Sequence, residues 1–277
     1  MDPHAYCQQR AASSGSSFYY SFLFLPQARR RAITALYAFC REVDDAVDET
    51  SDPSVARMKL AWWRTEIAAI YHDRPQHPVA LALADCVGTF RISREQLDEI
   101  VEGMQMDLER NRYESFDALR LYCHRVAGVV GVLSAEIFGY TDRSTLEYAH
   151  TLGIAFQLTN IIRDVGEDAR RGRIYLPGDD LRRYSIDDSD IMAGRESDNF
   201  RALMKFQIAR ARSFYSQAMD KLPRADRSTQ RAGLIMAAIY QRLLDEIETA
   251  GCPVLRSRVS LTPLRKLWIA WRTWVAG

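Results

Sequence analysis

The chain has 277 residues, of which 47% are hydrophobic, so it is long enough to bury a large core in a single domain. Its 37 Lys and Arg residues nearly balance its 36 Asp and Glu residues, and the formal net charge is +1. This balance excludes the broad basic surface by which many proteins bind nucleic acid, and it favours small-molecule partners.

Apolar residues recur at spacings of three and four through most of the chain, whereas alternating apolar and polar runs are nearly absent. This pattern predicts an all-α fold. Nothing marks a linker, so we expect residues 1–277 to form one domain. We expect short helices near 3–12 and 17–24, and longer helices at about 29–49, 54–73, 77–90, 94–110, 115–139, 143–169, 197–221, 225–250 and 261–275.

The five cysteines are scattered and form no CxxC pair, which favours reduced thiols and a cytoplasmic protein. The first residues lack the basic and apolar regions of a secretory signal. No stretch approaches the roughly 18 apolar residues of a membrane-spanning helix, so we expect no transmembrane segment.

The expected helix at 29–49 ends in an acidic cluster at residues 44–48, with sequence DDAVD. Asp44 and Asp48 share one helix face, whereas Asp45 points about 100° away and is expected to play a supporting part. On that face the apolar stripe continues into the acidic one at steps of four, four, three and four, through Ile33, Tyr37, Arg41, Asp44 and Asp48.

The expected helix at 143–169 ends in a second cluster, whose face carries Gly153, Gln157, Asn160, Asp164 and Asp168. Like charges four residues apart destabilise a helix by about 0.2–0.5 kcal/mol per pair, and a bound cation removes this penalty. Oxygen ligands favour Mg²⁺, which usually also binds substrate phosphates. The clusters therefore predict a magnesium site and a phosphorylated substrate. The alternative is that each cluster is a solvated helix end.

Residues 170–196 form the one long stretch with little expected regular structure, and long connections in compact domains are often lids. Because this stretch follows the second acidic cluster, we expect it to cover the site. Arg170, Arg171 and Arg173 could then close on a diphosphate, the alternative being ordinary surface charge.

The expected helix at 115–139 contains two interior glycines, Gly128 and Gly131, and interior glycine costs a helix up to about 1 kcal/mol against alanine. Either a neighbouring helix or a ligand therefore packs closely there. His124, in the same run, is expected to be a satisfied core residue rather than a catalytic one.

Residues 264–275 combine an apolar side with nearby basic residues, Arg265, Lys266 and Arg272. Such a segment fits peripheral contact with a membrane surface, at the inner face of the membrane for a cytoplasmic protein. The alternative is a terminal helix packed on the core.

Three sequence blocks resemble the squalene/phytoene synthase family of head-to-head prenyltransferases over nearly the full chain. They are YAFCREVDD at 37–45 with Asp48, Tyr122 with VAG at 126–128, and QLTNIIRD at 157–164 continuing through GRIYLP at 172–177. The resemblance implies a single-domain helical bundle of the isoprenoid synthase type, with a central substrate cavity and three Mg²⁺ ions at its mouth.

The resemblance also implies roles for individual residues. The metal ligands would be Asp44, Asp48, Asn160, Asp164 and Asp168. Diphosphate would contact Ser17, Tyr37, Arg41, Arg163, Tyr175, Tyr240 and Arg258. Other substrate contacts would come from Phe18, Tyr122, Val126, Gln157 and Arg173. Catalysis would depend on Tyr122 and Arg41 together with the four aspartates Asp44, Asp48, Asp164 and Asp168. Aromatic rings that could line the cavity and stabilise carbocations are Phe18, Phe22, Tyr122 and Phe156.

Within the family, residues 16–26 (SSFYYSFLFLP) look most like the presqualene diphosphate synthases of hopanoid biosynthesis. Such an enzyme condenses two farnesyl diphosphates without NADPH, and downstream isoprenoid enzymes are its natural partners. One alternative is a phytoene synthase that uses geranylgeranyl diphosphate, and another is full squalene synthesis with NADPH. An alternative of a different class is a non-catalytic assembly or scaffold protein of the same fold, in which eroded acidic clusters would be expected.

Overall fold

The structure, a computed structural model, describes residues 2–13, 21–22, 24–50, 52–72 and 74–276. Within these ranges the chain is helical without a strand, and one isolated bridge pairs Arg112 with Ile174. The all-α expectation is confirmed. Most of the helix expected at 17–24 lies outside the described residues.

The main helices are α1 (Pro3–Ser13), α3 (Gln27–Asp48), α4 (Pro53–His72), α5 (Pro78–Val87), α6 (Arg94–Glu109), α7 (Phe116–Cys123), α8 (Val129–Phe138), α9 (Ser144–Arg170), α12 (Asp198–Lys221), α13 (Arg231–Thr249) and α14 (Pro263–Ala276).

Several of these boundaries have a local cause in the sequence. The hydroxyls of Ser93 and Ser115 accept hydrogen bonds from backbone N–H groups in the first turns of α6 and α7, which are otherwise unpaired. Pro53, Pro78 and Pro263 occupy the first positions of α4, α5 and α14, where a missing N–H costs nothing. The helix expected from residue 225 starts instead at Arg231, after a short 3₁₀ turn, Arg224–Asp226.

The helix expected at 115–139 is interrupted by a π-helical turn, η1 (His124–Gly128), between α7 and α8. At Gly131 the close packing that the sequence predicts comes from a neighbouring helix, α9. A Cβ on Gly131 would collide with the carbonyl oxygen of Ala149, and one on Gly153 would collide with that of Ala127. These glycines therefore let α8 and η1 lie directly against the backbone of α9.

The stretch at 170–196 has more regular structure than expected, with two short helices, α10 (Gly178–Arg183) and α11 (Asp188–Met192). Asp180 of α10 accepts hydrogen bonds from Gln207 and Arg210 of α12, at 2.9 and 2.5 Å. A buried carboxylate paired with a guanidinium fastens α10 to the bundle, and apolar periodicity does not reveal such a contact.

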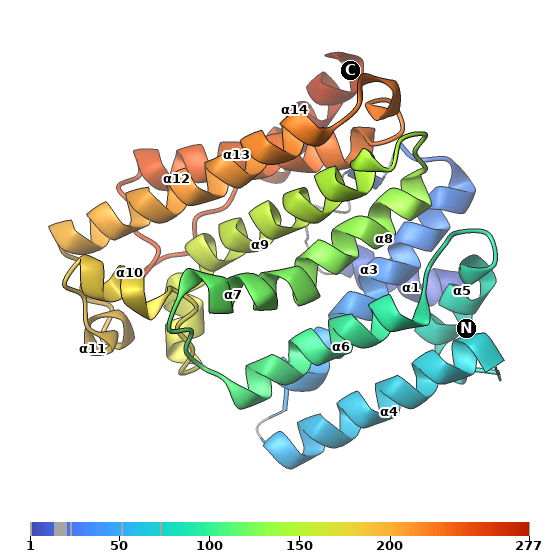
Figure 1. Ribbon diagram of the computed structural model, residues 1–277, viewed down its shortest axis with the longest axis horizontal. Coiled ribbons are helices and arrows are strands. Elements are labelled where there is room, and N and C mark those ends of the chain that lie inside the picture. Colours follow the sequence, from blue (N-terminus) through green and yellow to red (C-terminus); the bar gives the residue numbers. More distant parts are fainter. Residues whose placement is uncertain (1, 14–20, 23, 51, 73, 277) are drawn as a thin grey trace.

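Figure 1 shows the helices as a bundle with α9 in its middle, in contact with α12, α13 and α8. One apolar cluster surrounds α9, α12 and α13, and a second surrounds α3, α5, α6 and α8. Residues 116–138 are long and apolar enough to span a membrane, contrary to expectation, but this helix packs within the bundle against α9. Its apolar character is that of a core helix.

Candidate active site

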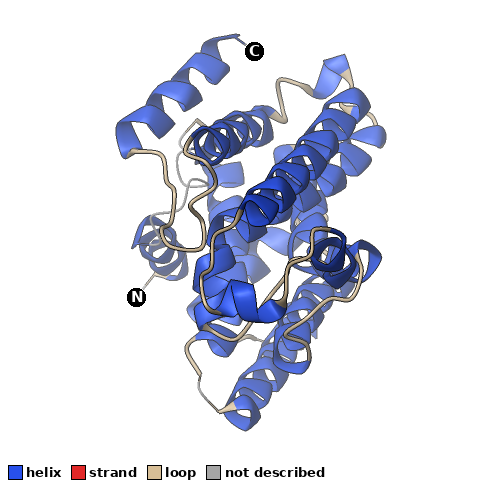
Figure 2. Cartoon of the chain, turned by 90° about the vertical axis from the view of Figure 1, so that its left-hand side faces the viewer, coloured by secondary structure: helices blue, strands red, loops and turns tan. Residues whose placement is uncertain are grey.

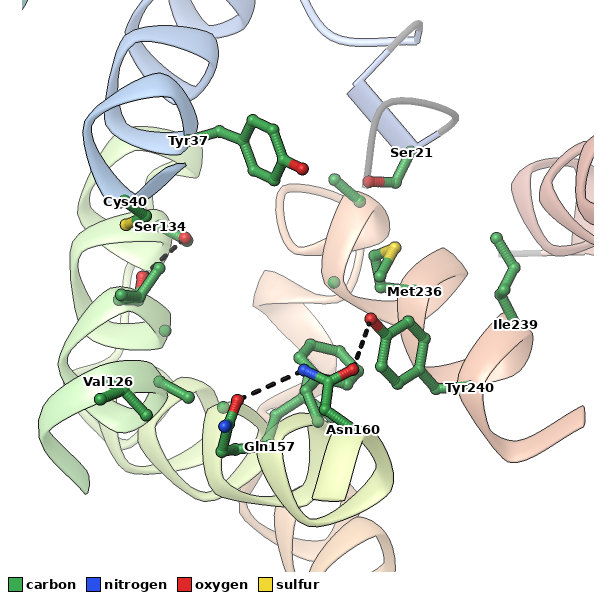
Figure 3. A pocket seen from close by; sticks show the side chains of 18 of the residues that line it. Ser21, Tyr37, Cys40, Val126, Ser134, Gln157, Asn160, Met236, Ile239 and Tyr240 are labelled. Atoms are coloured by element: carbon green, nitrogen blue, oxygen red, sulfur yellow. Dashed lines mark hydrogen bonds between the residues drawn. The ribbon is translucent and has the colours of Figure 1, made fainter. Parts of the chain in front are cut away.

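A cavity of about 690 Å³ lies between the two apolar clusters. Its lining residues come mainly from α3, α7, η1, α8, α9, α13 and residues 258–261, with single residues from α6 and α14. Its walls are largely apolar, with side chains such as Leu36, Leu152 and Phe156. Figure 3 shows Tyr37, Gln157, Asn160 and Tyr240 extending into it from three helices. An apolar chamber with one polar end suits a ligand with a hydrocarbon tail and a polar head.

Ten of the expected site residues line the cavity: Tyr37, Arg41, Asp44, Tyr122, Val126, Gln157, Asn160, Arg163, Tyr240 and Arg258. Asp168, Arg173 and Tyr175 border a second, smaller pocket. Asp48 and Asp164 lie one helical turn beyond Asp44 and Asn160. Phe22 and Phe156, two of the aromatic residues that the sequence analysis named as possible cavity walls, line the cavity. Ser17 and Phe18 lie outside the described residues.

Two side-chain hydrogen bonds order the polar end of the cavity. The Tyr240 hydroxyl donates to Oδ1 of Asn160 at 3.2 Å, and Nδ2 of Asn160 donates to Oε1 of Gln157 at 3.3 Å (Figure 3). Asn160 therefore presents an oxygen that is already oriented by a neighbouring helix, as a side chain that is to bind a ligand requires.

Arginines pair with most of the expected metal-binding carboxylates. Arg41 donates to Asp44 at 2.7 Å and to Asp45 at 2.8 Å. Asp48 is paired with Arg171 and Arg173 from the segment that follows α9. Asp164 is paired with Arg163 and, at 3.1 Å, with Arg258. Guanidinium groups thus pair with carboxylates of both acidic clusters, and the first residues of the 170–196 connection reach the site.

The acidic residues of three helices influence one another. The pKa of Asp44 is raised to about 7, mainly by burial and also by the charges of Asp48 and Asp107, against the opposing effect of Arg41. Burial also raises the pKa of Asp168 to about 7, with a further contribution from Asp164. Burial thus disfavours the ionised form of both carboxyl groups, although neighbouring arginines favour it, and a cation bound beside them would stabilise the ionised form.

This donor set fits a hard divalent cation. All of the candidate ligands are carboxylate or amide oxygens, and a bound cation would offset the burial that raises the pKa values of Asp44 and Asp168. Among the described residues, no three His, Cys, Asp or Glu side chains are grouped closely enough to hold one ion. Mg²⁺ commonly takes only one or two protein carboxylates and completes its shell with water and phosphate oxygens.

Asp107 of α6 is a candidate site residue that sequence reasoning missed. It accepts hydrogen bonds from the hydroxyls of Tyr122, at 2.9 Å, and Tyr175, at 2.7 Å, whose rings stack with centroids 5.2 Å apart. Burial raises the pKa of Asp107 to about 6. The signal was available, because Asp107 continues the buried stripe of Leu97, Ile100 and Met104, just as Asp44 does on α3.

Lys266 of α14 is a second residue that was missed as a site residue. It lines the cavity, and its pKa is lowered by burial and by the positive charges of Arg163 and Arg258. Three cations from α9, the 258–261 segment and α14 therefore lie near one another at the polar end. Such mutual repulsion is relieved by an anion of high charge density, such as a diphosphate.

His124 lies beside this site without facing the cavity. Its two ring nitrogens are 2.8 Å from His150 and 3.0 Å from Glu99. The imidazole is hydrogen-bonded on both sides, as expected of a satisfied histidine, and it connects the π turn to α6 and α9.

Comparison with known proteins agrees with this geometry. The squalene/phytoene synthase family description matches residues 11–265. The chain is 38% identical to phytoene synthase of Arthrospira platensis, covering 96% of this chain and 90% of the relative. It is 41% identical to phytoene synthase 1 of Arabidopsis thaliana, covering 94% of this chain but 63% of that longer protein.

Solved structures show the same architecture. A dehydrosqualene synthase in complex with ligand superposes with a TM-score of 0.89 at 25% identity, covering 99% of this chain and 96% of the other. Squalene synthase HpnC from Alicyclobacillus acidocaldarius superposes with a TM-score of 0.79 at 26% identity, covering 90% and 94%. Both comparisons confirm the isoprenoid synthase fold, and the chain belongs to the squalene/phytoene synthase family of head-to-head prenyltransferases.

Proposed function

We propose that the protein is a Mg²⁺-dependent presqualene diphosphate synthase, which condenses two farnesyl diphosphates head to head and releases one diphosphate, in squalene or hopanoid biosynthesis. The observation that carries the proposal is the composition of the cavity, whose apolar walls end in the Asp44 carboxylate, the Asn160 amide and the cations Arg163, Arg258 and Lys266. The choice of farnesyl diphosphate rests on the likeness of residues 16–26 to presqualene diphosphate synthases.

Each part of the cavity has a role in this reaction. Arg163, Arg258 and Lys266 would bind the diphosphate, while the carboxylates of Asp44, Asp48, Asp164 and Asp168 and the Asn160 oxygen would hold Mg²⁺. When bound, Mg²⁺ neutralises the charge that develops on the departing diphosphate. Breaking the allylic C–O bond sends its electron pair to the diphosphate and leaves an allylic carbocation. The apolar walls exclude water, which would trap that cation as an alcohol.

The double bond of the second farnesyl chain then attacks the cation, and loss of a proton closes the cyclopropane of presqualene diphosphate. The candidate acceptors of that proton are the released diphosphate and the Tyr122 hydroxyl. Tyr122 already donates its own proton to Asp107 at 2.9 Å, so a proton arriving on the phenol oxygen can be passed to the carboxylate. The π-systems of the stacked Tyr122 and Tyr175 rings would also stabilise the positive charge of the carbocation.

Phytoene synthesis from two geranylgeranyl diphosphates is the second candidate, and the names of the curated relatives, 36–41% identical, favour it. Both reactions use the same diphosphate chemistry and differ in the length of the hydrocarbon chain. Rates of Mg²⁺-dependent diphosphate release distinguish them. We expect kcat/KM to be higher with farnesyl than with geranylgeranyl diphosphate, and the opposite order would favour phytoene synthesis. Folded protein that releases diphosphate from neither substrate would favour the scaffold alternative.

A further inference from the structure

The helix α14 turns its apolar side outward. Its exposed large apolar residues recur at helical spacing, with 78% of Leu264, 55% of Trp268 and 56% of Trp271 accessible, and Leu267, Trp274 and Val275 at 40–60%. At about 100° per residue these six positions fall within about 120° of the helix circumference. The side toward α13 carries the buried Ile269 and Ala270 instead. Most surface helices show the reverse arrangement.

The exposed face extends beyond α14 itself. Phe24, which is 40% exposed, stacks on Trp274 with ring centroids 5.5 Å apart. Figure 2 shows the C-terminal helix at the outer edge of the molecule. We call the surface formed by Phe24, Leu264, Leu267, Trp268, Trp271, Trp274 and Val275 the tryptophan face. A contiguous group of seven exposed apolar side chains usually marks a docking surface.

The charges around the tryptophan face indicate what kind of partner it binds. α14 contains no acidic residue, and Arg265 and Arg272 border the face on one side. Arg272 lies over the Trp268 ring, 4.8 Å from its centroid, and Arg265 pairs with Glu246 at 2.6 Å. Tryptophan beside arginine suits the boundary between lipid headgroups and acyl chains, where an indole keeps one edge polar.

We propose that the tryptophan face docks on the surface of an anionic lipid bilayer, with α14 lying in the headgroup plane. Because Lys266 of the same helix lines the cavity, docking brings the polar end of the cavity close to the membrane surface. The inference rests on exposure and charge, and it holds for whichever prenyl diphosphate the cavity accepts.

Vesicle sedimentation tests the proposal on the full chain, independently of catalysis. The probes are vesicles of phosphatidylcholine alone and of equal parts phosphatidylcholine and phosphatidylglycerol. We expect the protein to sediment with the anionic vesicles, and less so as salt is raised, because salt screens the arginines. The double variant W268Q/W271Q should lose at least about tenfold in partitioning, since it removes the two most exposed indoles.

Trp62→Gln is the matched control, because Trp62 of α4 is also exposed, at 45%, but lies outside the tryptophan face. It should sediment like the unaltered protein. Protein that stays in the supernatant with anionic vesicles, or a double variant that sediments unchanged, would overturn the proposal. Sedimentation velocity supplies a further outcome: a dimer that W268Q/W271Q dissociates, without vesicle binding, would assign the face to a second copy instead.

Discussion

Asp48 of α3 and Arg173, which follows α9, form an ion pair with 2.7 Å between Oδ1 and Nη1, although 125 residues separate them in the chain. Arg173 thus occupies one of the carboxylate oxygens that we assign to a metal ion. When diphosphate and Mg²⁺ enter, this guanidinium can exchange its carboxylate partner for a phosphate oxygen. The pair is therefore a contact between the two halves of the site that substrate binding is expected to rearrange.

Replacing Asp48 or Asp164 with alanine should lower kcat at least about a hundredfold, because each change removes a proposed metal ligand where charge develops in the transition state. Helicity measured by circular dichroism should stay unchanged, since neither side chain is part of the apolar core. Glu49→Gln is the matched control. It removes one negative charge at an exposed position next to Asp48 and should leave turnover near normal. Near-normal rates in Asp48→Ala would contradict the assigned site.

Asp107→Asn should lower kcat about a hundredfold under the same assay, because the amide keeps the shape of the side chain but cannot receive a proton. The variant should also lose the part of the acid limb of the pH–rate profile that reports the Asp107 pKa of about 6. Tyr113→Phe serves as the control, because the Tyr113 hydroxyl is buried without a hydrogen-bond partner beside the same stack. An Asp107→Asn enzyme with an unaltered rate and profile would remove Asp107 from the mechanism.

The stability of the ligand-free protein should fall as pH rises toward neutrality. The pKa values of Asp44 and Asp168, about 7 in the fold, lie above the ordinary value of 3.8. A raised pKa means that the folded state binds protons more tightly than the unfolded state, so these two groups add stability below about pH 4 that is lost through about pH 7.

The thermal midpoint measures this effect. Adding Mg²⁺ with inorganic diphosphate should raise the midpoint more above about pH 8 than below about pH 6, because the ligand carboxylates must be ionised. Asp44→Asn should reduce the pH dependence. A midpoint gain from Mg²⁺ and diphosphate that is independent of pH would argue against these carboxylates as ligands.

Gly153→Ala should destabilise the fold by about 1–3 kcal/mol, because its Cβ would collide with the Ala127 backbone, which cannot move aside as a side chain can. Gly88→Ala is the control, since its helical backbone has open space around it and alanine there should be neutral or slightly stabilising. Denaturant unfolding compares the two. Equal stability of both variants would show that α9 and η1 can separate at little cost.

The sequence predicted most helices to within a few residues, because apolar periodicity records which face of each helix is buried. Arg163, which lines the cavity, was expected from the family resemblance. The pattern itself identified Asp44, Gln157 and Asn160, since polar residues that continue an apolar stripe are expected to face an interior space. Asp107 obeys the same rule. It was missed because a single aspartate in a charged helix does not form a cluster.

Other features depend on tertiary contacts that periodicity does not record. The π turn at His124–Gly128 belongs to a segment where α8 crosses α9 at glycines, and nothing in the local sequence distinguishes it from a regular helix. α10 is fastened by the pairing of Asp180 with Arg210, two residues 30 positions apart. The sequence predicted Lys266 only as one of the basic residues near a membrane-facing helix side. That its side chain lines the cavity depends on how α14 packs on α13.

Product identification tests the proposed function most directly. Purified protein is incubated with Mg²⁺ and either farnesyl or geranylgeranyl diphosphate, with and without NADPH, and the extracts are analysed by mass spectrometry. We predict presqualene diphosphate from farnesyl diphosphate, in an amount that NADPH does not change. A forty-carbon hydrocarbon formed from geranylgeranyl diphosphate, with no product from the shorter substrate, would contradict the account and identify a phytoene synthase.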